Sequence, residues 1–412
     1  MTAVIERTDP ARFDIPMWGG VGTEIHRPGG PRETARACQL AEELGYAGMG
    51  FSDQLQSWIF RSVWSPDLVP AAARIPDHEA FYDTLPLMAA CAMVTSRIRL
   101  GTVIDCYRRP PSLLAQTLNT LDHLSEGRVF IHIGTGENKQ FLPYGLERTE
   151  PRNARLEEFI RTVKILMASQ DPVTLPDNRF WPMEDALVAL PPFRVGRTVP
   201  IIMVGGGPRA MRIAARVADG IGTYIPGAFG DSVERYEEDL AVFWAEVERV
   251  GRDPKTLRAR AFDQVILCEN DAQVDEAVRS PFTRSLVLNL TPTGKTWREA
   301  WGVEHPLGDD WALSVTHRST MFTRDELLRI IEPVTPDVVQ RMILVATPEE
   351  AAARAVPWLR AAGTTHVPLT HGSNFSTTLF PDQLLPADDG LPRWHHLALR
   401  YTAELNRLLA AG

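Results

Sequence analysis

The chain has few cysteines, few lysines and no long apolar run. Its four cysteines form no Cys-x-x-Cys pair and are too widely spaced for a disulfide framework or a recognisable metal site. We therefore expect free thiols in a reducing compartment. The longest apolar run, residues 85–94, is too short to span a bilayer, and the first residues lack the apolar stretch of a signal peptide. These absences predict a cytoplasmic protein without a membrane span.

Composition and charge further limit the kind of protein that this chain can be. The 412 residues are 44% hydrophobic and 23% charged, which excludes a wholly disordered chain and a collagen-like rod. The formal net charge is −9, so no nucleic-acid partner held by phosphate contacts is expected. Four of the 43 basic residues are lysine, an arginine bias typical of GC-rich genomes. The composition predicts an acidic globular protein with a large core.

Short β-like runs alternate with amphipathic helical runs along the whole chain. The expected strands cover residues 12–18, 47–52, 98–104, 128–134, 199–205, 220–225, 258–267 and 365–370. The expected helices cover residues 32–44, 112–124, 154–168, 210–218 and 233–250. Several strands are near-continuous apolar runs, as in a parallel sheet buried on both faces. The pattern predicts an α/β fold, a (β/α)8 TIM barrel, with a doubly wound sheet as the structural alternative.

Three long segments interrupt this regular spacing, at about residues 54–83, 171–198 and 280–340. We interpret residues 1–412 as one domain in which these segments are lids at the C-terminal face, where the active sites of such barrels lie. The segments contain several large aromatic residues: Phe60, Trp64, Trp181, Trp297, Trp301, Trp311 and Phe322. If about half of these residues line the mouth, the pocket is large and apolar.

The turn after the fourth expected strand carries a carboxylate. Gly134, Thr135 and Gly136 allow the backbone to approach a flat ligand closely, and Glu137 is placed for proton transfer. Lys139 occupies the third glycine position of a dinucleotide fingerprint, which speaks against that motif. A tight turn with an exposed glutamate is the alternative interpretation.

The turn after the fifth expected strand, Gly205-Gly206-Gly207-Pro208, opens a helix. Backbone N–H groups at a helix N-terminus bind anions such as phosphate. A tight turn that holds no ligand is the alternative.

Other candidates lie at the ends of the second and third strands. Asp53 ends the second strand and Trp58 follows it, so they would place a polar group and an aromatic wall beside a ligand. A capping aspartate and a packing tryptophan would give the same pattern. Arg108 and Arg109 could bind an acidic tail or be solvated. His132 lies within an apolar strand and is interpreted as a core residue, and no metal site is expected.

Four motifs in this order resemble the luciferase-like monooxygenase superfamily, and more narrowly its branch that uses the deazaflavin coenzyme F420. They are Asp53-x4-Trp58, LGTVIDCYRRPP at residues 100–111, Gly-Thr-Gly-Glu followed by Pro143-Tyr144-Gly145, and Gly-Gly-Pro before a helix ending in Ala218-Asp219-Gly220. Later segments resemble phthiodiolone ketoreductase-like proteins. These segments are Trp181-Pro182, GVEHPLG at residues 302–308 and MILVATPEE at residues 342–350.

The resemblance implies that the deazaflavin lies in the mouth of the barrel. The cofactor-binding residues that it implies are Asp53, Thr102, Val103, Ile104, Gly134, Thr135, Gly136, Gln140, Gly205, Gly206, Gly207 and Pro208. In relatives, residues matching 102–104 form a bulge behind the ring, often with a non-proline cis peptide. Residues 205–208 match the turn that holds the phosphate, and Gln140 matches a contact to the cofactor tail.

The same resemblance implies the catalytic residues. Glu137 matches a carboxylic proton donor and Trp58 a tryptophan near the reaction centre. Gln54 stands where relatives usually have histidine. Because glutamine can hydrogen-bond a substrate oxygen but cannot exchange a proton near neutral pH, Glu137 becomes the main proton donor.

These residues predict an F420-dependent oxidoreductase. We expect it to reduce a ketone or an activated C=C bond of a bulky, apolar natural-product or lipid intermediate by hydride transfer from reduced F420. An FMN-dependent luciferase-like monooxygenase is the first alternative, and a catalytically silent cofactor-binding protein is the second. The family implies a homodimer, and the arginine bias is compatible with an actinobacterial source.

Overall fold

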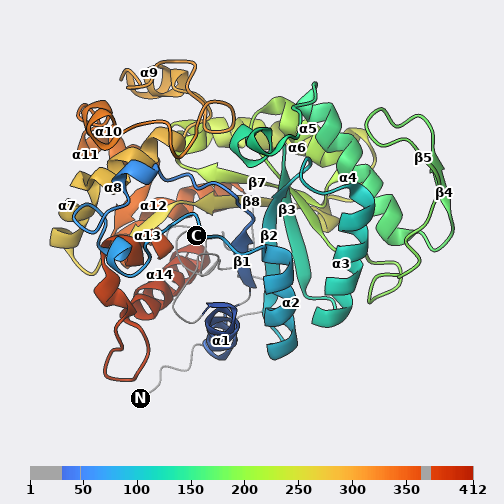
Figure 1. Ribbon diagram of the computed structural model, residues 1–412, viewed down its shortest axis with the longest axis horizontal. Coiled ribbons are helices and arrows are strands. Elements are labelled where there is room, and N and C mark those ends of the chain that lie inside the picture. Colours follow the sequence, from blue (N-terminus) through green and yellow to red (C-terminus); the bar gives the residue numbers. More distant parts are fainter. Residues whose placement is uncertain (1–29, 47, 363–372, 412) are drawn as a thin grey trace.

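The described part of the chain is built around a curled parallel sheet. The computed structural model describes residues 30–46, 48–362 and 373–411. Six strands pair in the order β1-β2-β3-β6-β7-β8, each parallel to its neighbour (Figure 1). Their bounds are β1 Gly48–Ser52, β2 Arg99–Asp105, β3 Val129–Gly134, β6 Ile201–Val204, β7 Gly220–Ile225 and β8 Arg258–Asp263. Since the order never reverses, the sheet lacks the switch point of a doubly wound fold.

The strand predictions agree with this sheet wherever the structure describes them. The predicted strand at residues 258–267 is divided at Gln264 into β8 and β9, Val265–Leu267. β9 pairs in parallel with β10, Leu344–Ala346, a three-residue strand that the sequence analysis missed. The predicted strands at residues 12–18 and 365–370 lie outside the described residues.

Helices connect the strands and cover the outer face of the sheet. The five predicted helices correspond to α1 Gly30–Glu43, α3 Pro111–Ser125, α4 Arg152–Ala168, α5 Pro208–Val217 and α6 Val233–Arg249. The others are α2 Thr84–Val94, α7 Asp271–Arg279, α8 Pro281–Leu286, α9 Lys295–Trp301, α10 Arg324–Ile330, α11 Pro336–Met342, α12 Pro348–Ala361, α13 Ser373–Leu379 and α14 Arg393–Ala410. α2, α3, α5 and α12 each pack on a strand of the sheet. None of the described helices is long and apolar enough to cross a membrane.

The concave face of the sheet is filled by side chains from distant strands. His132 on β3 meets Phe262 on β8 with ring centroids 4.9 Å apart, although β6 and β7 lie between these strands in the sheet. This contact shows how strongly the sheet curls. The interpretation of His132 as a core residue is confirmed, since the side chain is 1% exposed.

Glycines make room for the two phenylalanines of this inner layer. A Cβ atom at Gly101 would lie 2.3 Å from the ring of Phe130, and one at Gly222 would lie 2.3 Å from the ring of Phe262. Atoms cannot approach that closely, so each glycine and its phenylalanine form a matched pair. The two rings fill the centre of the curled sheet and leave open space only near the strand ends.

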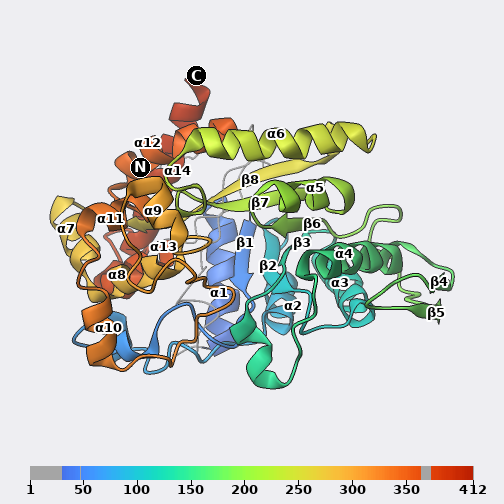
Figure 2. The same ribbon diagram turned by 90° about the horizontal axis from the view of Figure 1, so that it is seen from above.

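Residues 171–198 and residues 280–340 lie at opposite ends of the molecule, and residues 54–83 pack with the 280–340 segment (Figures 1 and 2). Residues 171–198 contain an antiparallel hairpin, β4 Val173–Leu175 with β5 Met183–Ala186. Glu158 on α4 accepts hydrogen bonds from the N–H groups of three successive residues of this segment, at 2.8–3.0 Å. Residues 280–340 form α8 to α11, which enclose a second apolar core.

The large aromatic residues expected at the mouth from the long segments do not line the pocket at the strand ends, so the condition for an aromatic-lined mouth is not met. Phe60, Trp64, Trp297 and Trp311 are buried in the second core, with Trp301 and Phe322 packed against it, and Trp181 packs against the main core. The long segments bury apolar surface of their own, and their large rings stabilise these cores rather than line the mouth.

We expect Gly101→Ala to lower the free energy of unfolding by about 1–3 kcal/mol, because the added methyl group overlaps the Phe130 ring. Phe130→Leu in the same chain should recover part of this loss. Urea unfolding of both single variants and the double variant measures the coupling. Strictly additive effects would contradict the paired packing.

Candidate active site

A pocket of about 240 Å³ opens at the C-terminal ends of the parallel strands. Active sites of barrels built from parallel strands lie at this end. Of the predicted site residues, those that line the pocket are Asp53, Gln54, Trp58, Val103, Ile104, Gly134, Thr135, Gly136, Glu137 and Gln140. Thr102 and the turn at residues 205–208 do not line it.

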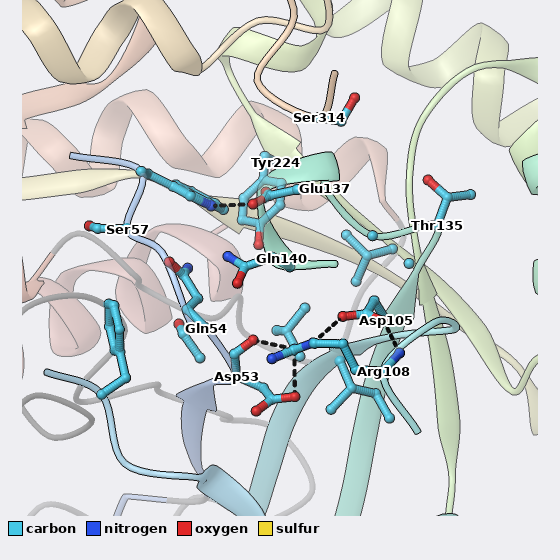
Figure 3. Close-up of a pocket in the computed structure, with 18 of the residues that line it drawn as sticks. Asp53, Gln54, Ser57, Asp105, Arg108, Thr135, Glu137, Gln140, Tyr224 and Ser314 are labelled. Carbon is cyan, nitrogen blue, oxygen red and sulfur yellow. Dashed lines mark hydrogen bonds and ion pairs between the residues drawn. The ribbon is translucent and has the colours of Figure 1, made fainter. Parts of the chain in front are cut away.

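One side of the pocket is an ion-pair network around Arg108 (Figure 3). Its guanidinium lies between two carboxylates, with Nη2 2.7 Å from Asp53 Oδ2 and Nε 2.5 Å from Asp105 Oδ2. Arg109 also contacts Asp53 and reaches Asp83 at 3.0 Å. The side chain of Asp53 is only 3% exposed. The two arginines are therefore neither solvated nor free for an acidic tail, and they hold Asp53 as a paired carboxylate.

Glu137 lies on another side, held by two donors. The indole Nε1 of Trp58 donates to Oε2 at 3.2 Å, and the ammonium of Lys139 lies 2.8 Å from the same oxygen. Lys139 is fully buried, and burial lowers the pKa of its ammonium while the carboxylate of Glu137 opposes that shift. The carboxylate that the sequence singled out is thus fixed in direction by a tryptophan and a desolvated lysine.

The loop that carries Trp58 is fixed mainly by the turn after β3. Gln140 accepts from the N–H groups of Leu55, at 2.7 Å, and Gln56, at 3.3 Å, and donates to the Gln56 carbonyl at 2.8 Å. Lys139 donates to that carbonyl at 2.9 Å. The amide of Gln140 is therefore engaged by protein backbone, which speaks against its predicted contact to a cofactor tail.

Residues of the 280–340 segment hold the same loop from the other side. His317 Nε2 lies 3.0 Å from the Ser57 carbonyl oxygen, and Asn289 donates to the Trp58 carbonyl at 2.9 Å. Asn289 also contacts His317 Nδ1 at 3.2 Å. Burial, and then the nearby charge of Lys139, lowers the pKa of His317 well below its usual range, so this imidazole is neutral at pH 7.

The glycine turn at residues 205–208 lies outside the pocket, and its role in holding the phosphate stays a prediction. Pro208 begins α5, as the sequence indicates, but the N–H of Gly207 donates to Asp239 on α6 at 2.6 Å. A carboxylate of the protein thus sits at this helix N-terminus, where a phosphate was expected. A second anion at this N–H would be repelled by Asp239.

The predicted bulge at residues 102–104 is wrong. Thr102, Val103 and Ile104 pair in regular register with β3, as partners of Ile131, His132 and Ile133. The Thr102 hydroxyl is buried and contacts the Thr84 hydroxyl at 3.1 Å, away from the pocket. The cis peptide bonds within the described residues both precede prolines, Pro151 and Pro226. Continuous pairing with both neighbouring strands leaves no extra residue for a bulge.

Gly136 meets a local steric requirement. Its φ is +73°, and a Cβ there would lie 2.8 Å from the Cβ of Asp105. Gly136 therefore forms a tight turn, but Glu137 is half-buried in the pocket wall and is not the exposed glutamate of the alternative interpretation.

The sequence analysis missed part of the lining. Arg108 appeared only as an open alternative, and Tyr224, Gln264 and Ser314 were not considered. Lys139 carried a usable signal, since it is one of four lysines and lies two residues after Glu137. Gln264 carried another, because it interrupts an apolar strand. Ser314 comes from the 280–340 segment, and no local pattern marks it.

Comparisons with known proteins identify the family of the chain. The profile of the luciferase-like monooxygenase family matches residues 12–366. The chain is 29% identical over 366 residues to phthiodiolone/phenolphthiodiolone dimycocerosates ketoreductase of Mycobacterium tuberculosis, covering 88% of this chain and 93% of the relative. It is 32% identical over 215 residues to F420-dependent glucose-6-phosphate dehydrogenase of Microbacterium testaceum, covering 51% and 56%.

A solved structure shares the fold. An F420-dependent secondary alcohol dehydrogenase, in complex with an F420-acetone adduct, superposes with a TM-score of 0.64 at 19% identity. The match covers 90% of this chain and 97% of that chain.

His317 predicts a pH-dependent component of stability. As pH falls below about 6.5, His317 binds a proton in the unfolded chain but stays neutral in the folded protein. The free energy of unfolding therefore falls by up to about 1.4 kcal/mol per pH unit. His317→Gln should remove this component and flatten the pH dependence between pH 7.5 and 5. Asn289→Ala, which cuts the same loop contact without removing a titrating group, should lower stability evenly. Urea unfolding across this range measures both, and identical slopes for wild type and His317→Gln would disprove the assignment.

Proposed function

Since the chain belongs to the luciferase-like monooxygenase family, we propose that it is an F420-dependent oxidoreductase that reduces the carbonyl group of a lipid or natural-product ketone. The observation that carries the proposal is Glu137, held by Trp58 and Lys139 in a pocket at the strand ends. The similarity to a ketoreductase over most of the chain supports the reaction type. The similarity to an F420-dependent dehydrogenase supports the cofactor.

The proposal includes a single domain, residues 1–412, with a complete (β/α)8 barrel. β10 extends the curl beyond β9 as a seventh strand, so one of the two remaining predicted strands, at residues 12–18 or 365–370, would complete a set of eight. The homodimer and the cytoplasmic location stay predictions from the sequence.

The described residues fit a flat ring better than they fit the charged tail of a deazaflavin. Val103, Ile104 and Val204 give the pocket an apolar side, and Trp58 and Tyr224 meet edge to face with centroids 5.8 Å apart. The expected phosphate turn, in contrast, lies outside the pocket and is bonded to Asp239. We therefore assign Val103, Ile104, Gly134 and Thr135 to the ring, and no described residue to the phosphate.

Reduced F420, when bound, would supply the hydride for the electrophilic carbon. The protein must then supply a proton to the oxygen that becomes anionic. Glu137 and Lys139 share a hydrogen bond of 2.8 Å, and burial makes the Lys139 ammonium a readier proton donor than an ordinary lysine. We assign Glu137 as the group that passes this proton and Lys139 as the group that resupplies it.

Neighbouring residues orient the carbonyl. Gln54 lines the pocket next to paired Asp53, and its amide N–H can donate to the carbonyl oxygen without exchanging a proton. Trp58 fixes Glu137 through its indole N–H and closes the adjacent wall. Burial raises the pKa of Tyr224, so this phenol stays neutral and can serve as a second donor.

Purified protein should bind F420 more tightly than FMN. The similarity to an F420-dependent dehydrogenase motivates this preference, and a deazaflavin, in which carbon replaces flavin N5, suits hydride delivery to carbon. Fluorescence quenching or calorimetric titration with both cofactors measures the preference. Tighter FMN binding, with oxygen consumption when reduced FMN is supplied, would instead establish the monooxygenase alternative. Binding of either cofactor without hydride transfer to any trial ketone would favour the catalytically silent cofactor-binding protein.

Glu137→Gln should lower kcat by about 10²–10⁴-fold, because the variant keeps the shape and the indole contact but loses the transferable proton. Cofactor affinity should change little. Glu147→Gln is the matched control, since Glu147 is exposed on the same connecting segment and should be silent. Reduction of a ketone by Glu137→Gln at nearly the wild-type rate would transfer the proton-donor role to another group.

A further inference from the structure

Gln264 lies on the inward face of the sheet, above the phenylalanine layer. Successive strand residues point to opposite faces. On β8, Arg260 lies over the Phe130 ring and Phe262 meets His132, so these alternate residues point inward. Asp263 points outward and bonds to Tyr401 on α14. Gln264 continues the inward series at the level where the pocket begins, and it lines the pocket.

The backbone of Gln264 is fixed from both sides. Its N–H donates to the Ile225 carbonyl at 3.3 Å, and its carbonyl accepts from the N–H of Leu344 at 2.7 Å. These bonds tie Gln264 to the end of β7 on one side and to the start of β10 on the other. The residue therefore lies where the six-stranded sheet meets the two-stranded sheet of β9 and β10. The side chain therefore starts from a rigid point and has little freedom to leave the pocket wall.

The side-chain amide of Gln264 is buried without a partner. The residue is 2% exposed, and among the described residues neither Oε1 nor Nε2 has a hydrogen bond. Buried amides almost always have partners, because an unmade hydrogen bond leaves the loss of hydration uncompensated. Gln140, the other glutamine buried in this wall, shows the usual case, with both amide atoms bonded to the loop.

We propose that Gln264 is a specificity-determining residue that binds a hydroxyl group of the substrate, so the enzyme prefers hydroxy ketones over plain ketones. This inference rests on the proposed ketone reduction. A hydroxyl group both donates and accepts, so it can satisfy Oε1 and Nε2 together. An anion would leave Nε2 satisfied but repel Oε1, and it would add a negative charge to a pocket that already contains Glu137. An apolar substituent would leave both atoms unpaired.

A buried polar group that awaits a hydrogen bond rejects ligands that lack the matching group. Dedicated sites of this kind reach discrimination on the order of 10⁴–10⁵-fold. For one neutral amide at the end of a pocket we expect about 10²-fold in kcat/KM. The same amide should lower the stability of the free protein, because its two atoms are desolvated without compensation.

The test uses two small ketones that differ only in the hydroxyl group, 3-hydroxy-2-butanone and 2-butanone, with reduced F420 as hydride donor. Wild type should favour the hydroxy ketone by about 10²-fold. Gln264→Met, which keeps length and volume without polar atoms, should lose this preference mainly through a higher KM for the hydroxy ketone. The free Gln264→Met protein should also have a higher Tm than wild type. Gln264→Leu is the second variant in case methionine packs poorly.

Gln116→Leu is the control, because Gln116 is exposed on α3 away from the pocket and should change neither Tm nor preference. Equal kcat/KM for the two ketones in wild type, an unchanged preference in both Gln264 variants, or a lower Tm in both would overturn the assignment. If reduced F420 transfers hydride to neither ketone, the proposed function fails. The Tm shifts that the two ketones induce in the cofactor-free proteins then decide the role of Gln264 separately.

Discussion

The candidate site depends on one buried cation. Lys139 is fully desolvated, and placing an ammonium there costs several kcal/mol unless its hydrogens are bonded. Glu137 and the carbonyl of Gln56 provide two of these bonds, at 2.8 and 2.9 Å. Because these partners come from two different connections, the lysine joins the turn after β3 to the loop after β1. The direction of Glu137 and the position of Trp58 are consequences of this junction.

Deeper in the curled sheet, away from the strand ends, two glycine and phenylalanine pairs fill the interior. The rings of Phe130 and Phe262 occupy the centre of the curled sheet because Gly101 and Gly222 leave room for them. The pocket is lined by residues from five strands, β1, β2, β3, β6 and β7, and from their connections.

The long 280–340 segment mainly holds the loop that carries Trp58 in place. Its tryptophans are enclosed in a second apolar core, and this core holds Asn289 and His317 against the carbonyls of residues 57 and 58. Since rings that pack in a core cannot also face a ligand, the apolar lining of the pocket comes from strand-end residues such as Val103, Ile104 and Val204.

The sequence by itself determined most of the strand and helix pattern, and it predicted that Asp53, Trp58 and Glu137 lie at the strand ends, where they line one pocket. These features depend on local periodicity and on turns next to strands, which a single chain displays directly. Only the tertiary structure decided which groups meet. Arg108 pairs with Asp53, 55 positions away, and Lys139 binds the carbonyl of Gln56, 83 positions away. Charge pairing of this kind, and the burial of Lys139 and Gln264, depend on neighbours in space, so a local pattern can mark these residues but cannot identify their partners.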